Sequence, residues 1–201
     1  MIVRIWPDNP NPKQIAHAAE VLRADGVIAY PTDSVYALGC SLHNPKAIER
    51  MRTIKGKDAS VFTLVFDSLA RIADFARVDN PQFRVLKHNL PGPFTFLLSP
   101  LSRVPEKALA RRKSIGVRVP SNPIARALIA ELGCPMLTTS VKDDDEFIEY
   151  TTDPELIHER YLRMVDMVID GGIGASTPTT VVDLTGDEPE ILREGLGELR
   201  Y

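Results

Sequence analysis

Three polar segments of the sequence carry side chains that could bind a phosphorylated or carboxylated substrate. Lys55 and Lys57 flank a glycine, and two cations so close together could neutralise the phosphates of a nucleotide. Arg118 lies inside the apolar run 115–119, where an unpaired charge is costly and a carboxylate or phosphate partner is expected. The loop 31–39 collects hydroxyls, a carboxylate and a phenol, which could orient a small polar substrate.

Each of these segments also has a structural explanation, and the residues alone leave both explanations open. Lysines at a helix C-terminus interact favourably with the helix dipole, by ~0.3–1 kcal/mol. Arg118 could form an internal salt bridge instead of a ligand contact. The loop could be a turn in which Asp33 and Ser34 satisfy backbone amides.

Further apolar runs are accompanied by hydroxyl side chains or by a second arginine, in the segments 137–140, 176–183 and 192–195. Hydroxyls in strand-forming sequence are usually structural. Their occurrence together with the lysines and Arg118 predicts a phosphate-binding cleft at the strand ends, where open α/β sheets usually bind ligands. The sequence contains no Walker loop, dinucleotide fingerprint or nucleophile elbow, so the familiar nucleotide-binding folds are not predicted.

Five helices and eight strands are predicted to position these segments. An Asn or Asp followed by Pro marks four helix starts, with N-caps at Asn44, Asn80, Asn122 and Asp153. A further helix is predicted from about residue 12 to residue 25, because apolar residues follow helical spacing and Gly26 supplies a stop. The predicted strands are 27–30, 62–66, 94–98, 115–119, 136–139, 167–169, 181–184 and 191–192.

The alternation of helices and strands predicts an α/β fold, taken as one domain over residues 1–201. The segment 180–193 resembles a hairpin around residues 185–187, so a mixed sheet is favoured over a purely parallel one. The acidic run 142–146 is predicted to be a solvated loop.

The composition restricts the possible partners. The 24 Lys and Arg residues against 27 Asp and Glu residues leave a net charge of −3, so binding of nucleic acid would require a local basic face. Its candidate contacts are Lys87, Arg103, Lys107, Arg111, Arg112 and Lys113, although the run 111–113 could equally be a solvated helix end.

Two distant cysteines, four histidines without metal-site spacing and no long apolar stretch predict a reduced cytoplasmic protein with no protein-ligated metal and no membrane partner. Cys40 and Cys134 are expected to be buried thiols.

The order of the polar segments resembles the YrdC/YciO family, whose best-known activity is the synthesis of threonylcarbamoyl-AMP for tRNA modification. The resemblance covers nearly the whole chain. It is carried, in family order, by the segments 31–36, 55–57, 117–120, 138–140, 179–183 and 193–195.

The resemblance implies a YrdC-like (YrdC/RibB-type) fold, a twisted mixed sheet flanked by helices with a large, positively lined cleft. It implies a nucleotidyltransferase that converts ATP, L-threonine and bicarbonate into threonylcarbamoyl-AMP and pyrophosphate, with Mg²⁺ on the phosphates and tRNA or double-stranded RNA as a further partner. By position, the implied catalytic residues are Lys55, Lys57 and Arg118. The implied substrate-binding residues are Thr32, Ser34, Tyr36, Thr138 and Thr179, and the implied ATP contacts are Lys55, Lys57, Ser140 and Arg193.

Three positions depart from the synthase pattern. Lys57 stands where an arginine is usual, Val61 where a lysine or asparagine is usual, and Lys142 where an asparagine is usual. Because lysine lacks the bidentate fork of arginine and valine has no donor, weaker phosphate binding is expected. These departures favour the YciO branch. The alternatives are an RNA-binding protein without efficient catalysis and an adenylating enzyme for another amino acid or carboxylate.

Overall fold

A computed structural model describes residues 1–56, 62–109, 111–141 and 151–201. The helices are α1 (Pro12–Arg23), α2 (Pro45–Lys55), α3 (Asn80–Asn89), α4 (Glu106–Leu109), α5 (Pro123–Leu132) and α6 (Pro154–Tyr161), with a 3₁₀ helix, η2 (Leu69–Asp74). The strands are β1 (Ile2–Arg4), β2 (Ile28–Tyr30), β3 (Ala37–Ser41), β4 (Thr63–Val65), β5 (Phe94–Leu98), β6 (Ile115–Arg118), β7 (Met136–Ser140), β8 (Met167–Asp170), β9 (Thr180–Asp183) and β10 (Glu190–Arg193).

These ten strands form one mixed sheet in the order β1-β8-β2-β3-β7-β4-β6-β5-β9-β10. β8 pairs in parallel with β1 and β2, whereas β3 and β7 pair antiparallel with their neighbours. The predicted mixed sheet is confirmed, as is the hairpin formed by β9 and β10. Two strands were not predicted. β1 is only three residues long, and β3 has the sequence Ala-Leu-Gly-Cys-Ser, which lacks the β-branched residues that usually indicate a strand.

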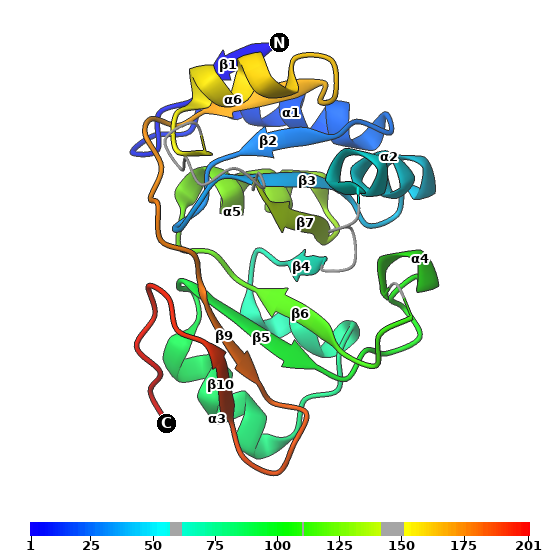
Figure 1. Ribbon diagram of the computed structural model, residues 1–201, viewed down its shortest axis with the longest axis vertical. Coiled ribbons are helices and arrows are strands. Elements are labelled where there is room, and N and C mark those ends of the chain that lie inside the picture. Colours follow the sequence, from blue (N-terminus) through cyan, green and yellow to red (C-terminus); the bar gives the residue numbers. More distant parts are fainter. Residues whose placement is uncertain (57–61, 110, 142–150) are drawn as a thin grey trace.

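Helices cover both faces of the first half of the sheet. α1 and α5 pack against each other on one face, and α2 and α6 lie on the other (Figure 1). The alternation along β2 explains this arrangement, because Ile28 and Tyr30 belong to the core under α1 and α5, while Val27 and Ala29 belong to the opposite core. None of the helices in the described ranges has the length and apolar character needed to cross a bilayer.

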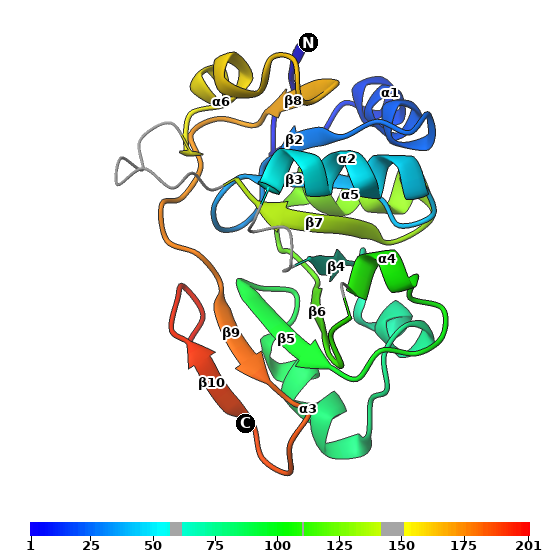
Figure 2. The ribbon, with the colours of Figure 1, turned by 45° about the vertical axis from the view of Figure 1, so that its right-hand side comes forward.

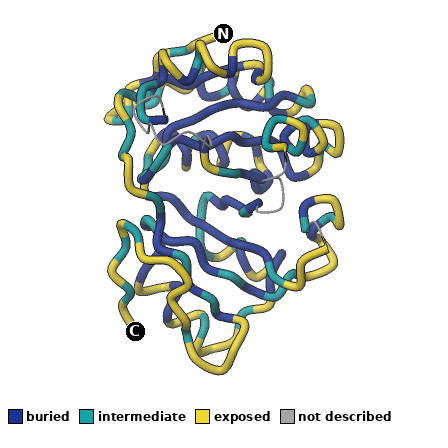
Figure 3. The backbone as a smooth tube through the Cα atoms, in the orientation of Figure 1, coloured by how far each residue is buried: buried dark blue, intermediate teal, exposed yellow. Residues whose placement is uncertain are grey.

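The second half of the sheet runs at a steep angle to the first. Figures 1 and 2 show β5, β6 and β9 crossing the direction of β2, β3 and β7, with the short strand β4 between the two sets. α3 packs behind this second half, and the two chain termini lie at opposite ends of the molecule. Figure 3 shows that the buried segments run through both halves, while exposed segments surround them. The sheet therefore changes direction at β4.

The Asn-Pro and Asp-Pro signals mark the helix starts correctly, but only two of the four predicted caps are confirmed. Asn122 and Asp153 accept hydrogen bonds from the first turns of α5 and α6. Asn44 occupies the cap position of α2 without capping it, because its side-chain amide donates to the carbonyl oxygens of Leu22 (2.8 Å) and Arg23 (3.2 Å) at the end of α1.

The cap of α3 was predicted at Asn80 and lies instead at Asp79. Asp79 Oδ1 accepts from the backbone N–H of Gln82 (2.8 Å), and the Gln82 side chain accepts from the backbone N–H of Asp79 (2.9 Å). This reciprocal capping box satisfies two backbone donors at once, which explains why the carboxylate one residue earlier takes the cap position.

Asp79→Ala is expected to lower the free energy of unfolding by about 1 kcal/mol, because it removes the acceptor for an otherwise unpaired helix N–H. Asn80→Ala provides the matched control. Asn80 is exposed within the first turn, so its truncation should change stability by less than about 0.5 kcal/mol. Urea denaturation of both variants measures the difference, and a larger loss for Asn80→Ala would contradict the assigned cap.

Candidate functional site

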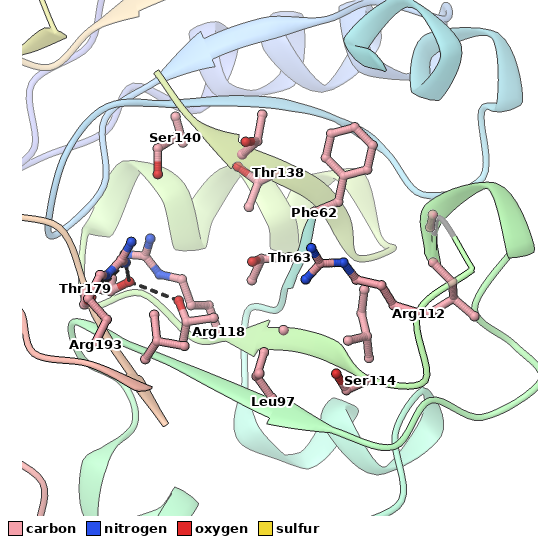
Figure 4. Close-up of a pocket in the computed structure, with 18 of the residues that line it drawn as sticks. Phe62, Thr63, Leu97, Arg112, Ser114, Arg118, Thr138, Ser140, Thr179 and Arg193 are labelled. Atoms are coloured by element: carbon pink, nitrogen blue, oxygen red, sulfur yellow. Dashed lines mark hydrogen bonds between the residues drawn. The ribbon is translucent and has the colours of Figure 1, made fainter. Parts of the chain in front are cut away.

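A cavity of about 310 Å³ is lined by residues from both halves of the sheet (Figure 4). Four cationic side chains contribute to its wall, namely those of Lys55, Arg112, Arg118 and Arg193. Hydroxyls supply most of the other polar lining, from Thr63, Thr95, Ser114, Thr138, Thr139, Ser140 and Thr179. The described part of this wall contains no carboxylate, so its charge favours an anionic ligand.

Arg118, at the end of β6, pairs with the carboxylate of Asp33 from the loop after β2. Both side chains are more than nine-tenths buried, with exposed fractions of 9% and 8%. Arg118 Nη2 also donates to Ser34 Oγ (3.2 Å) and Thr32 Oγ1 (3.4 Å), while Nε has no hydrogen-bond partner among the described residues. The sequence left open whether a ligand or an internal carboxylate partners Arg118. The structure provides the internal carboxylate, and the buried Nε still has no partner among the described residues.

Arg193, at the end of β10, lies beside Arg118 at the same end of the cavity (Figure 4). Its Nη2 and Nε donate to the Thr179 carbonyl oxygen at 2.9 and 3.2 Å, and Nη2 lies 3.3 Å from Thr179 Oγ1. Burial and the positive charge of Arg118 lower the pKa of Arg193. Two neighbouring guanidinium groups favour a bound anion at this end of the cavity.

Lys55 and two β7 residues line another part of the wall. Lys55 is the last residue of α2, and its Nζ donates to the Ser140 carbonyl oxygen (3.2 Å). Thr138 Oγ1 donates to the Leu38 carbonyl oxygen (2.7 Å) and lies 3.1 Å from the Tyr30 hydroxyl, which donates to it. Three of the four predicted ATP contacts, Lys55, Ser140 and Arg193, therefore meet at one cavity. Their predicted role in binding ATP stays a prediction.

Thr32 and Ser34, predicted to bind substrate, lie next to the cavity wall without forming part of its described lining. Thr32 Oγ1 donates to the Val35 carbonyl oxygen (2.8 Å) and accepts from the Ser34 N–H (3.0 Å), which closes the loop as a turn. Both hydroxyls also face Arg118 Nη2. Their contact with the cavity is therefore made through Arg118.

Tyr36, also predicted to bind substrate, is fully buried and directed at the loop after β8. Its hydroxyl donates to the Gly172 carbonyl oxygen (2.8 Å) and accepts from the Gly171 N–H (3.1 Å). Burial raises the pKa of Tyr36 to about 12. These contacts fix the connection between β8 and β9, which carries Thr179.

Arg112 was predicted as an RNA contact, which stays a prediction, and the structure places it in the cavity lining, on the side away from Arg193 (Figure 4). Its presence in the basic run 111–113 was the only sequence signal. Lys107, another predicted RNA contact, pairs with Glu49 at 3.3 Å. Thr63, Thr95 and Ser114 were missed, because single hydroxyls in or beside strands carry no recognisable pattern. Lys57, Val61 and Lys142 lie outside the described residues.

Comparison with known proteins identifies the fold and the family. The Sua5/YciO/YrdC family model, described as telomere recombination, matches residues 20–195. The chain belongs to this family. The resemblance expected from the order of the polar segments is thereby confirmed.

Two kinds of relative occur within the Sua5/YciO/YrdC family. Escherichia coli (strain K12) YciO, named an uncharacterized protein, is 47% identical over 199 residues, which cover 98% of this chain and 96% of YciO. Its crystal structure has a TM-score of 0.91 at 46% identity, covering 98% of this chain and 97% of that one. The threonylcarbamoyl-AMP synthase of Thiobacillus denitrificans (strain ATCC 25259 / T1) is 33% identical over 169 residues, covering 81% of this chain and 87% of the synthase. The higher identity to YciO agrees with the predicted branch.

A more distant structure carries a bound amino acid. The crystal structure of P. abyssi Sua5 complexed with L-threonine has a TM-score of 0.87 at 26% identity. The match covers 97% of this chain and 57% of the Sua5 chain. The predicted YrdC-like fold is therefore confirmed.

Tyr36→Phe is expected to lower the free energy of unfolding by about 1 kcal/mol near neutral pH, because a part-buried carbonyl and a part-buried N–H lose their partner. The Tyr36 pKa is raised from 10.0 to about 12 on folding, so its contribution is fully present below pH 10 and is lost as the pH rises through 12. The stability difference between wild type and Tyr36→Phe should therefore shrink across that window. Urea denaturation at pH 8, 10 and 11.5 measures it, and a difference that grows with pH would contradict the assignment.

Proposed function

We propose that this protein is a threonylcarbamoyl-AMP synthase-like nucleotidyltransferase that acts on ATP, L-threonine and bicarbonate, with a low turnover. The observation that carries the proposal is the single cavity in which Arg118, Arg193 and Lys55 meet a set of hydroxyls. The membership of the chain in a family that includes threonylcarbamoyl-AMP synthases supports this substrate set. The bound L-threonine of P. abyssi Sua5 supports an amino acid as one ligand.

The proposed reaction has two bond-forming steps. The threonine amine attacks the carbon of carbon dioxide and loses a proton, or attacks bicarbonate with release of water. Either route forms an N–C bond and yields a carbamate. A carbamate oxygen then attacks the α-phosphorus of ATP. The new O–P bond forms as the bond to the β-phosphate breaks, and pyrophosphate leaves. Such a reaction needs positioning and stabilisation of charge, and no protein nucleophile.

The cavity residues have different proposed roles, according to their charge and position. Lys55, Arg193 and the Ser140 hydroxyl contact the phosphates, where cations stabilise the charge that grows on pyrophosphate. Arg118 and the hydroxyls of Thr138 and Thr179 surround the amino acid and the adenylate. The Arg118 guanidinium binds the threonine carboxylate through its positive charge and a charge-assisted hydrogen bond.

Magnesium enters the proposal as part of the MgATP substrate. The described residues contain no cluster of three or more His, Cys, Asp or Glu side chains that could hold a metal ion. The phosphate oxygens of ATP are the hard ligands that Mg²⁺ prefers.

The low turnover follows from three residues that lie outside the described part of the chain. Lys57, Val61 and Lys142 replace an arginine, a lysine or asparagine, and an asparagine of the synthase pattern. By resemblance to the synthases, each replacement removes or alters a hydrogen-bonding group that those enzymes use.

RNA binding is the second candidate function and stays a prediction. Contacts from isolated lysines and arginines to phosphates would make such binding sensitive to salt and nearly blind to sequence.

The test is synthesis of threonylcarbamoyl-AMP from labelled ATP, L-threonine, bicarbonate and Mg²⁺, with pyrophosphate release followed in parallel and an authentic synthase as reference. Wild type is expected to be active but slower than the reference. Lys55→Ala and Arg118→Ala should each lower turnover by roughly tenfold or more, the cost of one charge-assisted hydrogen bond. The double change Val61→Lys and Lys142→Asn should raise turnover.

Lys46→Ala is the matched control for Lys55→Ala. Lys46 lies at the other end of α2 and pairs with Asp25 at 3.6 Å, away from the cavity, so its truncation should leave turnover unchanged. No product from wild type, or equal losses in both lysine variants, would refute the proposal.

A further inference from the structure

We infer that Asp33 is a positioning residue, which holds Nη2 of Arg118 so that Nε of the same guanidinium is presented to the carboxylate of the amino-acid substrate. This inference rests on the proposed function and adds to it a residue that determines specificity for the amino-acid substrate. Asp33 thereby makes the end of the cavity beside Arg118 specific for a carboxylate.

The hydrogen bonds of Arg118 are distributed unevenly. Nη2 donates to the Asp33 carboxylate, to Ser34 Oγ and to Thr32 Oγ1. The loop after β2 therefore supplies three acceptors for this one nitrogen. Nε is buried and has no partner among the described residues. A buried N–H without a partner is costly, and on a side chain that lines a cavity a ligand can supply the missing acceptor.

Asp33 is itself held in place from the other side. Its Oδ2 accepts from the Ser121 backbone N–H (2.9 Å) and from Ser121 Oγ (3.2 Å), while Oδ1 faces Arg118. Both carboxylate oxygens therefore act as acceptors. The backbone ahead of α5 thus fixes the carboxylate, and the carboxylate fixes the guanidinium.

Two effects of Asp33 on a substrate carboxylate oppose each other. Its negative charge repels the substrate, which would make Asp33 an inhibitor of binding. Its hydrogen bonds orient Arg118, which favours binding. Orientation outweighs repulsion here, because the adjacent Arg193 adds a second positive charge at this end of the cavity and offsets the charge of Asp33.

Asparagine cannot take over this role despite its equal size. If its oxygen faces Arg118, its amide N–H₂ faces the Ser121 N–H, and if it flips, the N–H₂ faces Arg118 Nη2. Either orientation places two donors against each other. Asp33→Asn should therefore displace the guanidinium, not merely remove a charge.

Calorimetric titration of the full chain with L-threonine, and separately with ATP, tests the inference without requiring turnover. Asp33→Asn is expected to weaken L-threonine binding about tenfold or more while changing ATP affinity less than about threefold. Ser121→Ala should weaken L-threonine binding by a smaller factor, because the backbone N–H still holds Asp33.

Asp166→Asn is the matched control. Asp166 also accepts from an arginine, Arg50 Nη1 (2.8 Å), and from a backbone N–H, that of Val27 (2.8 Å), and it lies outside the cavity lining. Its side chain is 41% exposed against 8% for Asp33, so its replacement should lower the unfolding temperature less and leave both ligand affinities unchanged. A purely structural role for Asp33 predicts the same pattern for the two variants.

Each outcome decides the question. Loss of L-threonine affinity in Asp33→Asn alone supports the inference. Unchanged or tighter L-threonine binding by Asp33→Asn, with normal binding by wild type, overturns the inference and leaves the proposed function standing. No L-threonine binding by wild type overturns both.

Discussion

The buried ion pair between Arg118 and Asp33 is the constraint on which the site depends. A guanidinium with an exposed fraction of 9% cannot stay in the core without a partner, and a carboxylate exposed to only 8% has the same requirement. The contacts that satisfy both side chains join three segments, namely the loop after β2, the end of β6 and the backbone ahead of α5. The position of the cationic end of the cavity follows from this junction.

The twist of the sheet determines which other residues meet there. β4 lies between the strands of the first half and those of the second half, which run at a steep angle to them, and residues of both halves line the cavity. Arg193 reaches the cavity from the last strand of the sheet, whereas Lys55 reaches it from the end of a helix that packs on β3. Cations that are far apart in the sequence thus concentrate in one place, where a low dielectric strengthens their attraction for an anion.

A site of this kind supports reactions in which the protein positions the substrates and stabilises their charge. Its polar groups are cations and hydroxyls, with neither a nucleophile activated by a base nor a metal cluster among the described residues. Transfer of a nucleotidyl group between substrates is compatible with this set, because the reacting groups belong to the substrates. Differences in rate among members of the family can then arise from a few donors around the phosphates, without any change of fold.

Local rules determined much of this protein from its sequence alone. Proline fixes the backbone for a helix start, strand residues alternate between two faces, and an arginine in an apolar strand demands an anionic partner, so the helix starts, most strands and the importance of Arg118 could be predicted. The Asp79 cap of α3 is also a local signal, because Gln82 follows three residues later, although the Asn-Pro pair favoured Asn80. Only the tertiary structure decided that the partner of Arg118 is Asp33, 85 residues earlier in the chain, and that Arg112 lines the cavity. Both depend on which strands pair and how strongly the sheet twists, and neither can be deduced from local spacing.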